Sequence, residues 1–360
     1  MKRGLLLACA LMVNASLASA EVVSAPLPDR HIQTAIERET YTIAVDADIY
    51  GETIDRVQAY RVTTLDWGEN PEEAFDLALW FDETVPLEKK DYDSIAFFPQ
   101  GQEERILWRD EARFSPYAIT FQRETHARLE FPFERLAVEG IVESVDAQLL
   151  EGFSLQQAEQ GINPILDALG VTIQREPVFV SCMTLGDWQA ETGKKLAYGV
   201  APDEFVVENW TQEDESCLIH YRQLFHGLPM METDEHMPGI VEWETPKTLV
   251  CALWSRRGLE KLEFPFVVGT QTALGEPFAP ITADEALAAC QSADMNLGEW
   301  RNLHISRIEL GYVMLAKNIA QTEIEARPAW LIRIWGEILG NMESVVAAVD
   351  AQTGDMMLSL

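Results

Sequence analysis

The chain has 360 residues, of which 47% are hydrophobic and 24% are charged. This composition supports buried cores and argues against a disordered tail. Asp and Glu number 59 against 27 Lys and Arg, which gives a formal net charge of −32. Nucleic-acid phosphates and anionic lipid surfaces both require a basic footprint, so this charge balance argues against either partner.

The first 20 residues have the pattern of a secretory signal peptide. Lys2 and Arg3 form a positive start, residues 4–13 are apolar, and Ala18-Ser-Ala20 is an A-x-A cleavage site. The alternatives are an uncleaved anchor, for which the apolar run is short, and a lipoprotein acylated on Cys9, which leaves too few apolar residues before the cut. The sequence therefore predicts an exported protein, periplasmic or extracellular, with no membrane span after cleavage.

The use of cysteine fits export. Cys9 leaves with the signal peptide, and Cys182, Cys217, Cys251 and Cys290 remain. Four cysteines permit two disulfides in three connectivities, or buried thiols that pack as small hydrophobic groups. The sequence does not choose between these states. Zinc ligands normally come in closely spaced pairs, and the wide spacing here argues against a zinc site.

Patterning divides the chain into four regions. They are the signal peptide at 1–20, an N-terminal α+β domain at 21–150, a middle helix-plus-antiparallel-sheet domain at 151–275 and a C-terminal domain at 276–360. Residues 21–39, at the start of the second region, have no firm period and are expected to be irregular. In the N-terminal domain β-branched alternation predicts strands at 41–50 and 57–64. Asn70 followed by Pro71 predicts the start of a helix of roughly 12 residues. Shorter strands are expected near 95–98, 106–108, 118–122 and 128–131.

The middle and C-terminal domains share one order, a capped helix followed by strands. Ser154 caps a helix that ends at Gly170, with a break or kink expected at Asn163 because Pro164 follows it. Thr282 opens the second helix with a capping box. The strands that follow are expected at 177–183, 218–225, 248–254 and 259–266, then at 304–315, 330–335, 345–349 and 356–358. Asp350 to Gly354 is expected to be a tight turn. The predicted fold class is α+β, with tandem units of a helix packed on a curved antiparallel sheet, and the recurrence suggests a duplicated unit.

Several short motifs in the second half resemble known exported bacterial proteins. The motifs are Thr282–Leu287 followed by Ile308–Tyr312, Pro328–Trp330 at the start of a strand, Val349–Asp355, and His220–Pro229 upstream. The first three resemble PepSY-like units, and the last resembles the YycH/YycI type, which includes uncharacterised gut-bacterial lipoproteins and secreted proteins. The match covers roughly residues 150–360.

This resemblance implies the same α+β fold and a non-enzymatic role. The better-known relatives modulate a membrane sensor kinase by contact or inhibit a protease from its propeptide. The YycH/YycI regulators keep an N-terminal membrane helix, whereas the apolar segment here looks cleavable. Kinase regulation is therefore not expected of this chain.

Motifs of catalysis and metal binding are missing from the sequence. It contains no G-x-S-x-G, H-E-x-x-H, G-x-G-x-x-G or Walker loop. His220 and His226 would share one face of a strand, but about 20 Å would separate them, too far for one metal ion. Asp234-Glu-His236 is expected to be a solvated acidic loop. We predict no catalytic, cofactor-binding or metal-binding residue.

The tryptophans and carboxylates leave two classes of function. Trp243, Trp254, Trp330 and Trp335 lie in or beside strands with an apolar face, which indicates core packing rather than stacking on sugars. Trp330 and Trp335 are expected on opposite faces of one strand. The leading hypothesis is an exported, non-catalytic binding or regulatory module that contacts another envelope or extracellular protein. The alternative is a secreted hydrolase of polysaccharide or peptidoglycan that uses unmarked paired carboxylates.

The signal-peptide pattern generates a direct test. The mature protein is expected to begin at Glu21 and to lie outside the cytoplasm, because Ala18 and Ala20 suit the small pockets of a signal peptidase. N-terminal sequencing of the protein from its native cells measures this. A chain that starts at Met1, or a lipid on Cys9, would contradict the expectation.

Overall fold

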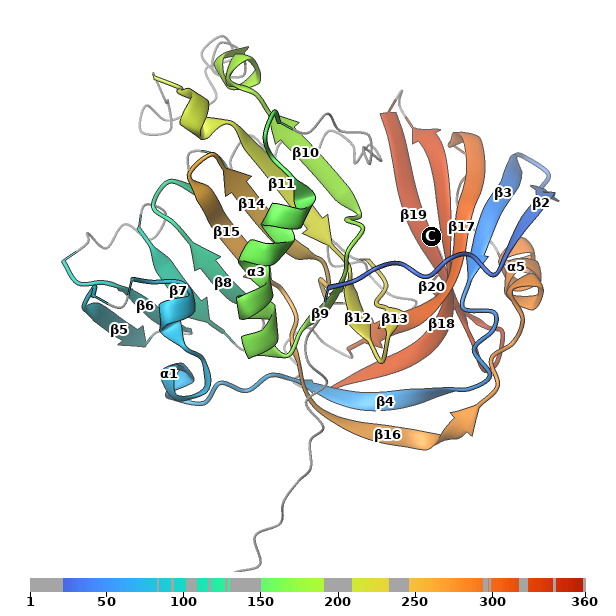
Figure 1. The fold of residues 1–360 in the computed structure, drawn as a ribbon. Coiled ribbons are helices and arrows are strands. Elements are labelled where there is room, and N and C mark those ends of the chain that lie inside the picture. Colours follow the sequence, from blue (N-terminus) through green and yellow to red (C-terminus); the bar gives the residue numbers. More distant parts are fainter. Residues whose placement is uncertain are drawn as a thin grey trace, which may run out of the picture.

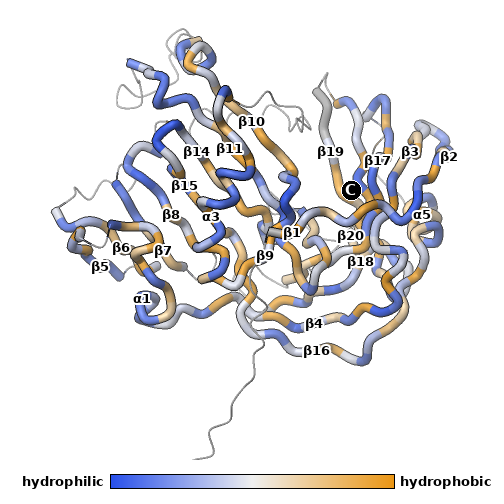
Figure 2. The backbone as a smooth tube through the Cα atoms, viewed as in Figure 1, coloured by the Kyte–Doolittle hydropathy of each residue, from blue (hydrophilic) through white to orange (hydrophobic). Residues whose placement is uncertain are grey.

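The fold is mainly β. The computed structural model describes residues 22–82, 84–91, 94–101, 109–115, 118–126, 129, 150–190, 209–232, 246–293, 297, 299–316, 323–338 and 341–358. About half of the chain is strand, arranged as a curled mixed half-barrel sheet and antiparallel sheets with few helices. Hydrophobic residues run along the strands of both large sheets, and hydrophilic residues gather at the turns (Figure 2).

The expected α+β fold of tandem helix-on-sheet units is therefore wrong. One reason is that strands form where none were expected, namely β2 (Arg30–Glu37) in the supposedly irregular lead and β16 (Val268–Phe278) before the second helix. Another is that the helix predicted from Asn70 is only four residues long, α1 (Pro71–Ala74). The short 3-10 helix η1 (Leu77–Leu79) follows it. The Asn70 side chain makes no capping hydrogen bond.

The first large sheet, called here the α3 sheet, has eight strands that are antiparallel to their neighbours. In spatial order they are β10 (Phe179–Met183), β11 (Ser216–Tyr221), β14 (Val250–Ser255), β15 (Gly258–Phe264), β8 (Ile119–Gln122), β7 (Glu111–Phe114), β6 (Ile95–Pro99) and β5 (Leu87–Asp91). The 3-10 helix η3 (Gln212–Asp214) precedes β11. Helix α3 (Leu155–Leu169) covers one face of the sheet, where Ile162, Ile165 and Leu166 join the hydrophobic core (Figure 1).

Helix α3 begins and ends where the sequence predicts. The Ser154 hydroxyl accepts a hydrogen bond from the Gln157 N–H, and Gly170 ends the helix in the left-handed region at φ +66°. Pro164 lies inside a helix that continues through it, so the break expected at Asn163 does not occur. Side chains on both sides of Pro164 are buried in the core, and this packing offsets the lost backbone hydrogen bond.

The second large sheet, called here the α5 sheet, curls. In spatial order it contains β16, β4 (Val57–Thr64), β18 (Glu323–Ile338), β17 (Arg301–Leu315), β3 (Thr42–Tyr50) and β2, and β18 also pairs with β19 (Asn341–Asp350), which pairs with β20 (Met356–Leu358). Only β3 and β17 are parallel among these described pairs. One end of β18 pairs with β4 and the other with β19, and this change of partner along one strand accompanies the curl.

Helix α5 (Ala283–Ser292) covers one face of the α5 sheet. The predicted capping box is confirmed, because the Thr282 hydroxyl accepts from the Glu285 N–H and the Glu285 carboxylate accepts from the Thr282 N–H. Leu287 and Cys290 pack in one core with Ile332 of β18. No helix in the described segments is long and apolar enough to cross a membrane.

The predicted C-terminal hairpin is also confirmed. Asp350 Oδ1 accepts from the backbone N–H groups of Gln352 and Thr353 at 2.8 and 3.0 Å, and Gly354 lies at φ +78°. β19 and β20 pair antiparallel on either side of this turn. Trp330 is buried, and its indole N–H donates to the Ile281 carbonyl at 2.8 Å.

A small sheet lies between the two large ones (Figure 1). Its strands are β1 (Val22–Val23), β9 (Thr172–Gln174), β12 (Gln223–Phe225) and β13 (Leu228–Pro229). The chain after β13 meets the α5 sheet, where the Met231 N–H donates to the Tyr312 carbonyl at 2.7 Å.

The sheets combine strands from regions that are far apart in the sequence. The α5 sheet joins β2–β4 of the predicted N-terminal domain to β17–β20 of the predicted C-terminal one. The boundaries at 150/151 and 275/276 stay predictions, because strand pairing does not show which parts fold independently. The strand expected at 106–108 lies outside the described residues, as does the one at 128–131 apart from Leu129.

One of the possible disulfides is present. Cys182 and Cys217 are register partners on β10 and β11, with Cα atoms 4.0 Å apart, and their sulfurs are bonded. Cys251 on β14 and Cys290 on α5 carry thiols. The disulfide hypothesis is therefore right for Cys182 and Cys217, and the hypothesis of a buried thiol is right for Cys290, whereas Cys251 is partly exposed.

The junction between the small sheet and the α5 sheet generates a prediction. A Cβ on Gly311 would lie 2.5 Å from the Pro229 carbonyl oxygen and 2.7 Å from Leu331 Cδ1. Gly311→Ala is therefore expected to lower the free energy of unfolding by about 1–3 kcal/mol, since the backbone of β13 must move away. Thermal unfolding followed by circular dichroism measures this.

Gly186→Ala is the matched control. Gly186 is exposed, and the nearest atom its Cβ would meet is Thr184 Oγ1 at 3.7 Å. The melting temperature of Gly186→Ala is expected to equal or slightly exceed that of the wild type. Equal melting temperatures for the two alanine variants would show that the close approach at Gly311 is unimportant.

Candidate functional site

The structure separates the histidines that the sequence placed on one strand face. β11 ends at Tyr221, and His226 lies in the turn after β12 at φ +50°. The His226 ring stacks on Tyr60 at 4.4 Å, and its Nε2 is 2.8 Å from Gln271 Oε1. The Asp234–His236 segment lies outside the described residues. Within the part of the chain that is described, no cluster of His, Cys, Asp and Glu has metal-binding geometry.

Of the four tryptophans named above, those that the structure describes pack against the protein core. Trp330 and Trp335 are 1% and 3% exposed, so neither offers a platform for a sugar ring. The Trp254 ring packs against helix α3 at Gly161, where a Cβ would lie 2.4 Å from a ring carbon. Trp243 lies outside the described residues.

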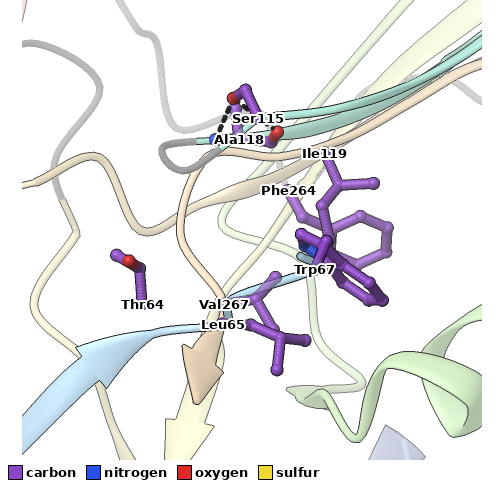
Figure 3. A pocket seen from close by; sticks show the side chains of 8 residues that line it. All are labelled: Thr64, Leu65, Trp67, Ser115, Ala118, Ile119, Phe264 and Val267. Carbon is purple, nitrogen blue, oxygen red and sulfur yellow. Dashed lines mark hydrogen bonds between the residues drawn. The ribbon is translucent and has the colours of Figure 1, made fainter. Parts of the chain in front are cut away.

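A small pocket of about 170 Å³ lies where the two large sheets meet (Figure 3). Its lining residues are Thr64, Leu65, Trp67, Ser115, Ala118, Ile119, Phe264 and Val267. None of these is an acid or a base, and the Ser115 hydroxyl bonds the backbone of Ala118 at 2.8 Å (Figure 3). The enclosed space holds little more than one water molecule, so this pocket is too small and too plain for a substrate.

A cluster of buried charges, called here the arginine cluster, joins the small sheet to the α5 sheet. Arg222 lies between β11 and β12, and its side chain is 7% exposed. Its Nη1 is 2.9 Å from Glu309 Oε1 on β17 and donates to Gln174 Oε1 on β9 at 3.3 Å. Its Nη2 pairs with Glu232, which follows β13. One guanidinium therefore ties together three segments that are distant in sequence.

Two further arginines complete the arginine cluster. Arg307 on β17 donates to Glu309 through Nε at 2.9 Å and Nη2 at 2.8 Å, and its guanidinium lies 4.3 Å from the centre of the Tyr50 ring. Arg333 on β18 is the register partner of Arg307 and pairs with the second oxygen of Glu232. Each glutamate thus pairs with two arginines.

The arginine cluster has a structural role. Burial lowers the pKa of Arg222, and the charge of Glu309 partly offsets this effect. A guanidinium in a protein nevertheless keeps its proton, so the arginines do not act as acids or bases. Removing one partner from a buried ion pair costs about 3–5 kcal/mol, because the other charge is left unpaired. We conclude that the cluster fixes the position of the small sheet relative to the α5 sheet.

One carboxyl group on helix α3 has a pKa shifted upward. Glu159 on α3 is 6% exposed, and burial raises its pKa although Arg175 Nε donates to it at 3.2 Å. The negative charge of Glu176 adds to the rise. Burial raises the pKa of Tyr221 as well, and the charge of Glu159 contributes. Among the described carboxyl groups whose pKa shift is resolved, Glu159 is the one shifted upward.

None of these charged residues belongs to a sequence motif that predicts a site. The available signal was a charge inside an apolar strand, as at Arg307 and Glu309 within 304–315 and Arg333 within 330–335. A strand that is buried on both faces must pair such charges. The partners Arg222 and Glu232 come from a bend and from the end of a hairpin, where no periodic pattern exists.

The raised pKa of Glu159 generates a pH prediction. Because the folded state holds this proton more tightly than the unfolded chain does, the carboxyl group destabilises the fold as pH rises above its unfolded value near 4.5. Glu159→Gln is therefore expected to raise the free energy of unfolding at pH 7, and the gain should shrink toward zero by pH 4. Urea denaturation at both pH values measures it.

Glu285→Gln is the control of opposite sign. Hydrogen bonds from the Thr282 N–H and hydroxyl lower the pKa of Glu285, so its ionised form stabilises the fold above the unfolded pKa. This variant should be less stable than the wild type at pH 7, and the deficit should vanish as the pH falls through the lowered pKa. A pH-independent difference for Glu159→Gln would remove the electrostatic explanation.

Comparison with known proteins supports the fold and no function. No protein-family model matches the chain, and no curated protein matches its sequence. Among solved structures, an uncharacterized protein from Eubacterium rectale ATCC 33656 is similar over 92% of this chain and 94% of its own, with a TM-score of 0.61 and 12% identity. At this identity the similarity shows a shared fold across nearly the whole chain.

Proposed function

We propose that this protein is exported and works by binding another envelope or extracellular protein, without catalysis. The observation that carries the proposal is the edge strand β16. It has 11 residues, and in the described structure it pairs only with β4. Most of its residues are exposed along this outer edge of the α5 sheet (Figure 1).

The edge of β16 carries its guarding residues, Glu276 and Pro277, at one end, and the register-paired stretch from Gln271 to Leu274 has no charge, proline or register shift. Edge strands are commonly guarded by charged residues that discourage pairing with another chain. β5, at an edge of the α3 sheet, carries Glu88, Lys89, Lys90 and Asp91. By contrast, residues 268–275 of β16 contain no charged residue. An extended segment of a partner protein can add to such an edge through backbone hydrogen bonds.

The described surface favours this mode over hydrophobic docking. Its exposed large hydrophobic side chains are Val23 and Leu27, both in the N-terminal lead. Two residues do not form the contiguous apolar patch of several hundred Å² that marks many interfaces. Backbone pairing at a strand edge requires no such patch.

The resemblance to PepSY-like and YycH/YycI-type proteins supports the same proposal. The terminal hairpin around Asp350 and Gly354 is one of the segments that carries this resemblance. Relatives of those groups act on other proteins by contact, and the signal-peptide pattern would place this chain in the same compartment as such partners. The family relationship is part of the proposal.

A secreted hydrolase of polysaccharide or peptidoglycan is the second candidate. It is favoured by Glu159, whose shielded carboxyl group has the raised pKa expected of a general acid. Against it, Arg175 holds that carboxyl group, and the pocket of about 170 Å³ contains neither residue. Turnover of a glycan that disappears in Glu159→Gln would favour this candidate.

Site-specific photo-crosslinking tests the binding proposal. A photoreactive amino acid replaces Thr272 in β16, and the control replaces Asp167, which is exposed on α3. In cells that make the protein naturally, position 272 should give a crosslink to one discrete protein and position 167 should not. Absence of an adduct at 272, or the same adducts at both positions, would overturn the proposed role of the edge.

A further inference from the structure

Three chemically active side chains lie in one row across the α3 sheet. Cys251 on β14 is the register partner of His220 on β11 and of Glu263 on β15. Direct partners on neighbouring antiparallel strands point to the same face, with Cβ atoms about 4.5–5.5 Å apart. The imidazole of His220 is therefore within reach of the thiol of Cys251.

This row faces away from helix α3. The neighbours Val250 and Ala252 belong to the core under α3, and alternation along the strand places Cys251 on the other face. Cys217 belongs to the same core, so the Cys182–Cys217 disulfide also lies on the α3 side. The sheet itself thus separates the disulfide from the Cys251 thiol.

Cys251 differs from the other thiol in accessibility. Cys290 is fully buried, and burial raises its pKa to about 11. Cys251, by contrast, is partly exposed, as are His220 and Glu263. A partly exposed thiol beside a histidine is the setting in which cysteine becomes reactive.

The charges around the row act on the Cys251 thiol in both directions. Burial raises the pKa of Glu263, but Lys261 at 2.9 Å, followed by the charges of Lys247 and His220, outweighs it, and the net pKa is lowered. The ionised Glu263 lies directly opposite Cys251 and opposes a thiolate there, whereas the positive charge of Lys261 beside it reduces this effect. An imidazolium beside a thiol stabilises the thiolate, which is the nucleophilic form.

We propose that Cys251 is a reactive thiol, activated by His220, that undergoes thiol–disulfide exchange with small disulfides. His220 takes the thiol proton, and Cys251 Sγ attacks one sulfur of the disulfide. A new S–S bond forms to Cys251 as the original S–S bond breaks. The departing thiolate takes the proton from His220, so Cys251 is oxidised to a mixed disulfide and one half of the reagent is reduced to a thiol.

The test uses 5,5′-dithiobis(2-nitrobenzoic acid) as the disulfide and the folded, full-length protein. Mass spectrometry of proteolytic peptides should find the adduct on Cys251 and none on Cys290, and Cys251→Ser should abolish it. The rate against pH should have its midpoint below the ordinary thiol value of about 8.5. A midpoint at or above that value, or no adduct on Cys251, overturns the proposal without any variant.

His220→Gln separates activation from access. This variant should react roughly tenfold more slowly at pH 6.5, equivalent to one unit in the thiol pKa. At pH 9.5, where thiols ionise unaided, its rate should match the wild type. His31→Gln is the control, since His31 is bonded to Asp46 and Asp48 on the exposed part of the α5 sheet. If His220→Gln follows the wild-type profile, His220 does not activate Cys251.

Discussion

The arrangement of this protein depends on one buried guanidinium. Arg222 sits where β11 of the α3 sheet passes into β12 of the small sheet, and it pairs with Glu309 of the α5 sheet and with Glu232. A charge this deeply buried is tolerated only when its hydrogen-bonding groups meet oppositely charged partners. The positions of the three sheets are therefore coupled, because a shift of any one of them would leave a charge unpaired.

The arginine cluster also explains why the outer backbone edge of β16 can stay without a strand partner among the described residues. The two large sheets each bury one face under a helix, and the cluster fixes how they meet through the small sheet. β16 contacts the small sheet through Gln271, whose Oε1 lies 2.8 Å from His226 Nε2, while its outer backbone edge pairs with no described strand. A backbone edge that faces away from the junction is open to the proposed partner, whereas an edge inside the junction would not be.

The sequence predicted those parts of the fold whose signals are local. The caps at Ser154 and Thr282, the glycine at Gly170 and the turn at Asp350 to Gly354 depend on residues within one helical turn or one hairpin, and all were found. The helix expected from Asn70 failed because its cap pattern lacked a side-chain hydrogen bond and tertiary packing overrode the propensity.

The candidate sites were not predictable in the same way. Arg222 and Glu309 are 87 residues apart, and no period connects them. The row of His220, Cys251 and Glu263 exists only through the strand order β11-β14-β15, which no local pattern specifies. Local sequence patterns thus predicted individual helices, strands and turns. The candidate sites, by contrast, depend on which strands become neighbours in the sheets.

The pairing of β3 with β17 has a consequence for how the chain reaches its folded state. The Tyr312 hydroxyl donates to the Gln58 carbonyl across 254 residues of sequence, and the strands around them hold the first and last parts of the chain in one sheet. Contacts between such distant residues form late, since the entropy of a long loop must be overcome first. During synthesis β3 lacks its partner β17, and β4 lacks its partner β18, until the C-terminal strands have emerged. A chain whose early strands need such late partners stays partly unfolded while it is being made, and a partly unfolded chain is the form that the export proposed above would require.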